Sequence, residues 1–180
     1  TKVEVAAAAI EAGAEMVNDV SAAADIGMLE LVAERGAAIV LMHMRGEPRT
    51  MQQDLHYTNV VAEVHEYLRL RARAATDAGI PANRVWLDPG IGFGKDDAGN
   101  LALLAALPDL GALGHPVLVG PSNKSFIGRL TDADVDNRLP GTLAALIPVL
   151  GIGRAGVRVH DPAAALQFLD IASRVSEKSA

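Results

Sequence analysis

The sequence predicts an α/β fold built on a parallel sheet, and three observations carry this prediction. Short apolar segments with strand patterns alternate with longer segments of helical periodicity over the whole chain. Hydrophobic residues make up 50% of the 180 residues but aromatic residues only 3%, so the core must consist of Ala, Val, Leu and Ile, as in helices packed on parallel strands. No linker-like or low-complexity segment interrupts the pattern, so residues 1–180 are expected to form a single domain.

The first half of the chain begins with a helix that no strand precedes. Its apolar residues recur at helical spacing up to Gly13, and two further helices are stopped by Gly36 and Gly79. Between the helices lie short apolar runs, of which the first ends in the polar pair Asn18-Asp19. The expected elements are a helix over 2–12, a strand over 16–19, a helix over 25–35, a strand over 37–42 and a helix over 58–78.

The second half continues the alternation. Ser122 is expected to cap the helix that follows the fourth strand, Pro148 to kink a later helix, and Asp161-Pro162 to open the last one. The expected elements are strands over 84–87, 117–120 and 156–160, and helices over 100–107, after Ser122, over 137–150 and after Asp161. A complete eight-unit barrel needs ~250 residues, so five strands indicate either an open sheet or the later part of a barrel.

Charge and composition exclude several classes of function. The net charge is −6 and no long basic run occurs, so nucleic acid and anionic membranes are poor partners. The absence of cysteine excludes disulfides, thiolate metal sites and cysteine nucleophiles. No signal peptide and no apolar run of spanning length is found, so we expect a cytoplasmic protein without a membrane partner.

The segment 85–95, Val-Trp-Leu-Asp-Pro-Gly-Ile-Gly-Phe-Gly-Lys, is the first candidate site. Asp88 ends a strand, and the glycines after it permit positive φ or close backbone approach. Parallel α/β proteins place their chemistry at the carboxyl ends of the strands. The segment lacks the spacing of nucleotide-binding loops, so it favours a functional site only slightly over the alternative that Asp88 caps the next turn.

Polar residues also end the other strands. Arg158 and His160 are two residues apart and are expected on the inner face of the last strand, where a ligand anion or an ion pair to Asp88 or Asp19 would balance the charge. Lys124 is mildly opposed by the dipole of its helix, so a ligand or carboxylate partner explains its position better than helix stability does; a solvated lysine is the alternative. Asn18 could pair with the edge of a heterocycle or simply form a turn.

Five short segments are distributed along the whole chain. They are Val17-Asn18-Asp19-Val20-Ser21, Leu41-Met42-His43-Met44, 87–95 with Leu-Asp-Pro-Gly-Ile-Gly-Phe-Gly-Lys, 120–128 with Gly-Pro-Ser-Asn-Lys-Ser-Phe-Ile-Gly, and Arg158-Val159-His160-Asp161. Together they resemble the dihydropteroate synthase family, in its order and spacing. The resemblance implies a TIM (β/α)8 barrel of the pterin-binding type, of which this chain would hold the later units, about five strands.

The resemblance also implies an activity and its residues. The family consists of transferases of folate biosynthesis, inhibited by sulfonamides, that condense 6-hydroxymethyl-7,8-dihydropterin pyrophosphate with p-aminobenzoate to 7,8-dihydropteroate and pyrophosphate. The implied roles are pterin binding for Asn18, Asp88, Lys124 and Arg158, pyrophosphate binding for Arg158 and His160, p-aminobenzoate binding for Ser125, Phe93 and Lys124, and catalysis for Asp88, Lys124 and Arg158. Magnesium and a homodimer are implied as well, with no metal ligand in this chain.

Two departures from the family pattern shape the expectations. Asn123 stands where the family usually has arginine, which removes one cation. The family's first three strands are expected to be missing, together with the metal-binding asparagine, so these 180 residues alone should bind ligands but turn over poorly. The alternatives are a methyltetrahydrofolate–corrinoid methyltransferase-like barrel, which needs no pyrophosphate site, and a non-catalytic partial barrel that binds a partner through its open edge.

Overall fold

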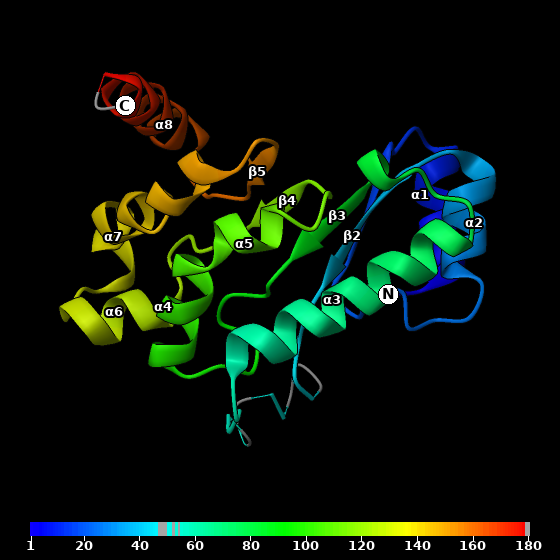
Figure 1. Ribbon diagram of the computed structural model, residues 1–180, viewed down its shortest axis with the longest axis horizontal. Coiled ribbons are helices and arrows are strands. Elements are labelled where there is room, and N and C mark those ends of the chain that lie inside the picture. Colours follow the sequence, from blue (N-terminus) through cyan, green and yellow to red (C-terminus); the bar gives the residue numbers. More distant parts are fainter. Residues whose placement is uncertain (47–49, 52, 54, 179–180) are drawn as a thin grey trace.

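The computed structural model describes residues 1–46, 50–51, 53 and 55–178. Five parallel strands form one sheet in the order β1-β2-β3-β4-β5, which is also their order in the chain (Figure 1). Their bounds are β1 Met16–Asp19, β2 Ala38–Met42, β3 Val85–Asp88, β4 Val117–Val119 and β5 Ala155–Val157. Because the order never reverses, the sheet is wound in one direction, as in a barrel and unlike a doubly wound sheet.

Helices connect the strands. Their bounds are α1 Val3–Glu11, α2 Met28–Arg35, α3 Val60–Asp77, α4 Asp97–Ala105, α5 Leu107–Gly111, α6 Ser125–Thr131, α7 Leu139–Ala144 and α8 Pro162–Glu177, with 3-10 turns η1 Ala82–Arg84, η2 Val135–Asn137 and η3 Ile147–Gly151. The alternation of strands and helices is confirmed. The single helix expected over 137–150 is wrong, because the chain forms α7 and then η3, with Pro148 at the start of η3. Within the described residues, no helix has the length and apolar character needed to cross a membrane.

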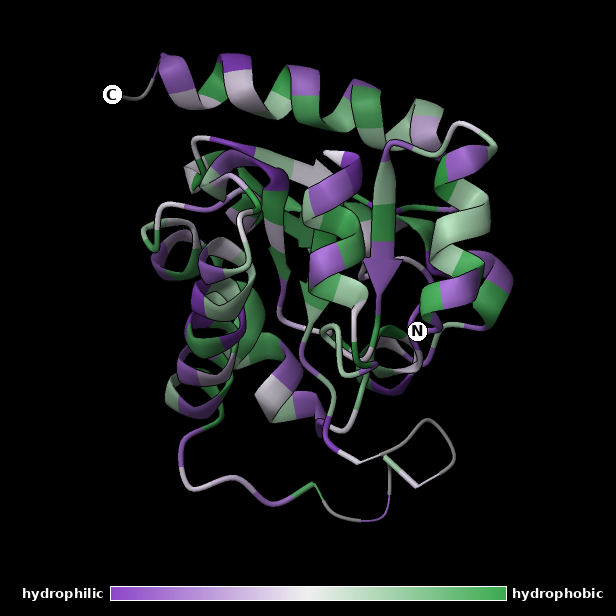
Figure 2. Cartoon of the chain, turned by 90° about the vertical axis from the view of Figure 1, so that its right-hand side faces the viewer, coloured by the Kyte–Doolittle hydropathy of each residue, from purple (hydrophilic) through white to green (hydrophobic). Residues whose placement is uncertain are grey.

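The outer face of the sheet forms the core with the helices. In register, Leu41 pairs with Leu87 and Leu87 pairs with Val117, and all three are fully buried. The long helix α3 turns Val64, Leu68, Ala72 and Ala75 toward this core, at the spacing of one helical face. In Figure 2 the strands are mostly hydrophobic, whereas hydrophobic and hydrophilic residues alternate along α8.

The opposite face of the sheet carries the polar residues. Met42 pairs with Asp88. Two residues earlier along these strands, Val40 pairs with Trp86 and, on the other side, with Asn18. Leu118 pairs with Gly156, and the Arg158 N–H donates to the Val119 carbonyl at 2.9 Å, which extends the same pattern beyond β5. Since side chains alternate along a strand, Asn18, Asp88 and Arg158 all face the inner side of the curved sheet.

Candidate active site

The loop after β3 is shaped by three glycines with positive φ. These angles are 68° at Gly90, 81° at Gly92 and 69° at Gly94. A Cβ on Gly90 would lie 1.9 Å from the His43 carbonyl oxygen, and one on Gly94 would lie 2.8 Å from the Arg45 carbonyl oxygen. The loop therefore touches the backbone that leaves β2, and only glycine permits this approach.

Asp88 is the last residue of β3 and is 9% exposed. Its Oδ1 accepts a hydrogen bond from the Gly90 N–H at 2.7 Å. Burial raises the pKa of Asp88 to about 6, while the Gly90 N–H and the positive charges of Lys124, Lys95 and Arg158 act in the opposite direction. The site thus holds a carboxylate that is ionised near neutral pH but protonated in mild acid.

Lys124 comes from the next strand-to-helix loop and reaches across to the glycine loop. Its Nζ donates to the Ile91 carbonyl at 2.6 Å and lies 4.0 Å from the centre of the Phe93 ring. Burial lowers the pKa of Lys124, the Asp88 carboxylate raises it, and Arg158 lowers it further. Lys124 is therefore half-buried near the Asp88 carboxylate. The alternative, a fully solvated lysine, does not hold.

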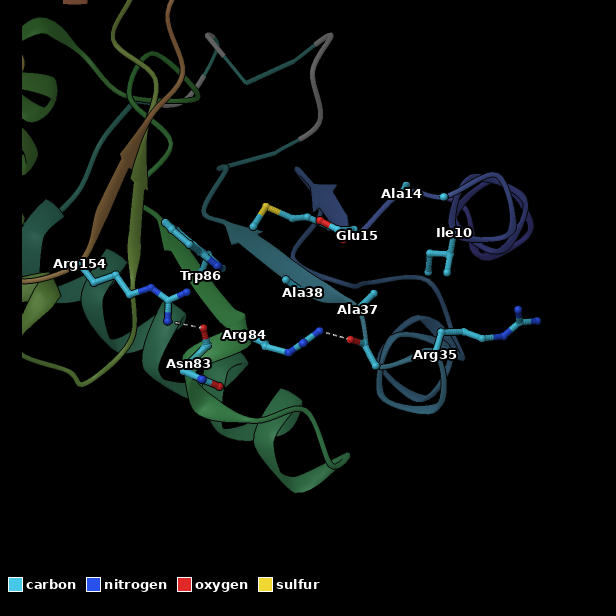
Figure 3. Close-up of a pocket in the computed structure, with 13 residues that line it drawn as sticks. Ile10, Ala14, Glu15, Arg35, Ala37, Ala38, Asn83, Arg84, Trp86 and Arg154 are labelled. Atoms are coloured by element: carbon cyan, nitrogen blue, oxygen red, sulfur yellow. Dashed lines mark hydrogen bonds between the residues drawn. The ribbon is translucent and has the colours of Figure 1, made fainter. Parts of the chain in front are cut away.

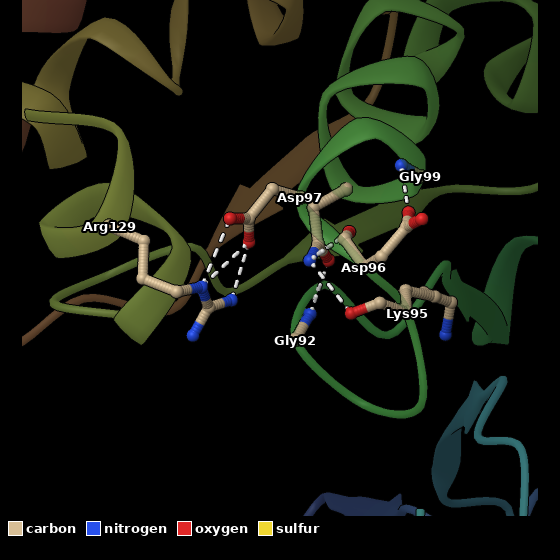
Figure 4. Close-up of polar contacts among 7 residues, drawn as sticks. Gly92, Lys95, Asp96, Asp97, Gly99 and Arg129 are labelled. Carbon is tan, nitrogen blue, oxygen red and sulfur yellow. Dashed lines mark hydrogen bonds and ion pairs between the residues drawn. The ribbon is translucent and has the colours of Figure 1, made fainter. Parts of the chain in front are cut away.

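Two buried polar side chains, Lys95 at the end of this loop and Asn100 in α4, have no role assigned from the sequence. The Lys95 ammonium group donates to the carbonyls of His43, Gly90 and Phe93. Asn100 accepts from the Gly92 N–H at 2.6 Å and donates to the carbonyls of Lys95 and Asp96. Figure 4 shows polar contacts of Gly92, Lys95 and Asp96 beside the ion pair of Asp97 with Arg129. The only signal in the sequence is the position of Lys95 at the end of the glycine motif.

Ser122 does not cap a helix, so that expectation is wrong. The helix α6 begins three residues later, at Ser125, and Lys124 at its N-cap position makes no side-chain cap. The Ser122 hydroxyl instead lies 2.8 Å from the His160 Nδ1 and accepts from the His160 N–H at 3.1 Å. The hydroxyl therefore positions His160 at the carboxyl end of the sheet.

Arg158 differs from its expectation in two ways. The last strand ends at Val157, so Arg158 and His160 follow it, and both are exposed. The ion pairs among the described residues do not include one from Arg158 to Asp88 or Asp19, and Asp19 is occupied by Ser21 and the Ala23 N–H. The expectation of a buried arginine assumes a closed inner face, but β5 is an edge strand.

The structure brings part of the expected site together. Asp88, Lys124 and Phe93 are neighbours, and the charge of Arg158 acts on Asp88 from the same face. Asn18 is exposed on β1, two strands from Asp88 on that face. Ser125 is the exposed first residue of α6, directly after Lys124. His160 reaches the same end of the sheet through Ser122.

Comparison with known proteins identifies the family. The family model described as pterin binding enzyme matches residues 1–160. This chain belongs to the pterin-binding enzyme family. Over 174 residues it is 42% identical to the dihydropteroate synthase of Synechocystis sp., an alignment that covers 96% of this chain and 60% of that relative. The chain thus spans about 60% of the length of this curated relative.

Solved structures agree with this assignment. Dihydropteroate synthase of Xanthomonas albilineans with 4-aminobenzoic acid superposes with a TM-score of 0.88 at 45% identity, covering 97% of this chain and 62% of that one. Dihydropteroate synthase of Thermus thermophilus in complex with 6HMPPP superposes with a TM-score of 0.90 at 44% identity, covering 97% of this chain and 70% of that one. The expected fold class, a TIM barrel of the pterin-binding type with about five of its strands present here, is confirmed.

The opposite end of the sheet has a different character. A cavity of about 720 Å³ is lined there by Arg35, Arg84, Arg154 and Trp86 (Figure 3). Arg84 donates to the Gly36 carbonyl and Arg154 to the Asn83 carbonyl, and Arg154 also lies over the Trp86 ring. Arg84 and Arg154 hold turns before the strands, away from the glycine loop.

Proposed function

We propose that the protein carrying this chain is a dihydropteroate synthase, which joins 6-hydroxymethyl-7,8-dihydropterin pyrophosphate to p-aminobenzoate and releases pyrophosphate. The observation that carries the proposal is the cluster of Asp88, Lys124 and Phe93 at the carboxyl end of the sheet, with Arg158 on the same face. The relatives crystallised with 4-aminobenzoic acid and with 6HMPPP support both substrates.

The roles proposed for the residues follow from their chemistry. Asp88 accepts hydrogen bonds from the amino and N–H edge of the pterin, and Lys124 and Asn18 hold further polar atoms of the ring. Arg158 stacks on the ring and, with His160, neutralises the pyrophosphate. Phe93, Lys124 and Ser125 receive p-aminobenzoate, with the Lys124 ammonium group attracting its carboxylate.

The reaction itself needs no protein nucleophile. The aromatic amine attacks the methylene carbon of the pterin, the carbon–oxygen bond breaks, and its electron pair leaves with pyrophosphate. Asp88 stabilises the positive charge that develops on the ring, and Arg158 with His160 stabilises the departing anion. The amine then gives up its proton to solvent. Asp88, Lys124 and Arg158 are therefore the proposed catalytic residues.

Magnesium is the cofactor that the family resemblance implies. Among the described residues, no three His, Cys, Asp or Glu side chains gather closely enough to hold a metal ion. These residues alone do not fit a protein-bound magnesium site. Residues 1–180 are proposed to act as part of one barrel domain, binding ligands when isolated but turning over poorly because the inner face is open to water.

A homodimer is proposed from the apolar surface around α8. Exposed apolar residues line a cavity of about 760 Å³ between η3 and α8; they are Ile147, Ile171 and Val175. If a second copy presents the same surface, one two-fold contact covers the apolar surfaces of both copies. Sedimentation equilibrium of the full-length protein tests this, since Ile171→Asp should lower the mass from two subunits to one, and a monomeric wild type would contradict it.

The activity is tested by mixing the full-length protein with the pterin pyrophosphate and p-aminobenzoate. Dihydropteroate and pyrophosphate should appear in equal amounts. A methyl transfer enzyme or a binding module would release no pyrophosphate, so its absence would overturn the proposal.

The role of Arg158 is tested by calorimetry with two ligands. Arg158→Ala should weaken the pterin pyrophosphate by about tenfold or more, because a charge-assisted contact to phosphate is lost, and should weaken the pterin without phosphates less. Arg154→Ala, at the other end of the sheet, is the matched control. Equal losses for the two ligands would show that Arg158 serves only the ring.

A further inference from the structure

Lys95 is an unusual residue of the glycine loop, because its ammonium group is buried and forms no ion pair with a carboxylate. The side chain is 1% exposed, and none of the ion pairs among the described residues includes it. Its Nζ donates to the carbonyls of His43 at 3.1 Å, Gly90 at 3.0 Å and Phe93 at 2.9 Å. A buried ammonium group is expensive to desolvate, but it satisfies three carbonyl acceptors that an apolar side chain would leave without a donor.

The three carbonyls belong to the segments that form the site. His43 leaves β2, and its N–H donates to the Asp88 carbonyl at 3.0 Å. Gly90 donates its own N–H to the Asp88 carboxylate, and the Phe93 ring lies under the Lys124 ammonium group. Lys95 thus fixes, from behind, the two loop residues that orient Asp88 and support Lys124.

We propose that Lys95 is a positioning residue of the pterin site, which holds the glycine loop so that the Asp88 carboxylate stays ionised and correctly placed. This inference rests on the proposed function and names a residue that acts through Asp88. The three acceptors match the three N–H groups of an ammonium ion, whereas a neutral amine has only two.

The charged surroundings support an electrostatic part in this role. Asp88 is faced by Lys95, Lys124 and Arg158, and all three favour its ionised form. Lys95 is faced by Asp88 and Lys124; burial lowers the pKa of Lys95 to about 7, and the Asp88 carboxylate raises it. His43 stays neutral even in mild acid, because burial and the charge of Lys95 lower its pKa to about 3.

The test compares pH profiles of kcat/KM for dihydropteroate formation in the full-length protein. Lys95→Met should lower kcat/KM by about tenfold or more and move the acid limb of the profile up by about one pH unit, because Asp88 loses a nearby cation. Lys95→Arg keeps the charge but displaces the donors, so kcat should fall while the acid limb stays in place. Lys178→Met, which removes an exposed lysine at the end of α8, should leave both unchanged.

The outcomes separate this inference from the proposed function. Wild-type protein without dihydropteroate formation would overturn the proposed function. An active wild type together with a folded Lys95→Met variant of unchanged kcat/KM and unchanged acid limb would overturn the role of Lys95. If Lys95→Met does not fold, the Lys95→Arg variant tests the proposal instead. A kcat equal to that of the wild type in Lys95→Arg would overturn the positioning role, because it would show that the position of the donors has no effect on the site.

Discussion

The two ends of the same five-stranded sheet hold charged side chains in different ways. At the carboxyl end, Asp88 and Lys95 are buried close together and their pKa values move toward neutrality. At the amino end, Arg84 and Arg154 are exposed and donate to backbone carbonyls of neighbouring turns. Exposed arginines of this kind stabilise turns at little cost, whereas buried charges cost folding free energy and are retained where a ligand uses them.

Backbone geometry separates the two ends as well. After β3, Gly90 and Gly94 pack against the carbonyls of His43 and Arg45. Before the strands, Gly13 and Gly36 also have positive φ, but a Cβ on either would meet nothing within 4 Å. The amino-end glycines serve only the turn, whereas those of the carboxyl end let two loops touch. Substitutions at both ends of the sheet test this difference.

The largest effect is expected for Gly90→Ala. The added Cβ would lie 1.9 Å from the His43 carbonyl oxygen at a φ of 68°, so the backbone must move away from β2. We expect the free energy of unfolding to fall by about 3 kcal/mol, and kcat/KM to fall more than about a hundredfold because Asp88 and Phe93 are displaced. Urea unfolding and steady-state kinetics of the full-length protein measure both.

Gly153→Ala is the control for this substitution, because Gly153 has open space around it and no positive φ. Its stability should stay within about 0.5 kcal/mol of wild type. A Gly90→Ala variant with similarly small effects would contradict the close packing of the two loops.

Asp88→Asn should lower kcat/KM by about a hundredfold, because the amide keeps the shape of the carboxylate but lacks its charge. In the wild type, kcat/KM should decline as the pH falls through about 6, since the raised pKa of Asp88 protonates it there. The variant should lose that limb of the profile. An unchanged limb in Asp88→Asn would assign the titration to another group.

Asp88→Asn should lower activity without lowering the free energy of unfolding. The folded state binds the Asp88 proton more tightly than the unfolded chain, so ionising Asp88 lowers stability as the pH rises from about 4 to about 6. Asp88→Asn should therefore be at least as stable as wild type at pH ~8. A variant that is both inactive and strongly destabilised would indicate a structural role for Asp88.

The sequence is sufficient for the parts of the site that depend on local order along the chain. Asp88 ends a strand and Lys124 precedes a helix, and parallel strands bring such positions to one edge. The contact of Lys124 with Phe93 joins two consecutive loops of this kind. Their meeting can therefore be inferred from the order of the elements alone.

Other features depend on contacts that the order of the elements does not reveal. Lys95 meets the carbonyl of His43, 52 residues earlier, and a carbonyl carries no side-chain signal in the sequence. The hydroxyl of Ser122 fits a helix cap by its chemical type, but its partner, His160, lies 38 residues later. Burial of Arg158 requires neighbouring strands on both sides of β5, which instead forms the edge of this sheet.

The smallest effect is expected at the amino end of the sheet, for Arg154→Ala. Arg154 is exposed, donates to the Asn83 carbonyl at 2.9 Å, and lies 5.2 Å from the centre of the Trp86 ring. Loss of one exposed hydrogen bond and one cation–π contact should lower the free energy of unfolding by about 1 kcal/mol, and kcat/KM should stay within about twofold because no catalytic group is touched. Urea unfolding and steady-state kinetics of the full-length protein measure the two quantities. If Arg154→Ala instead reduced kcat/KM as much as Asp88→Asn does, the amino end would take part in the reaction, and the division of roles between the two ends of the sheet would be wrong.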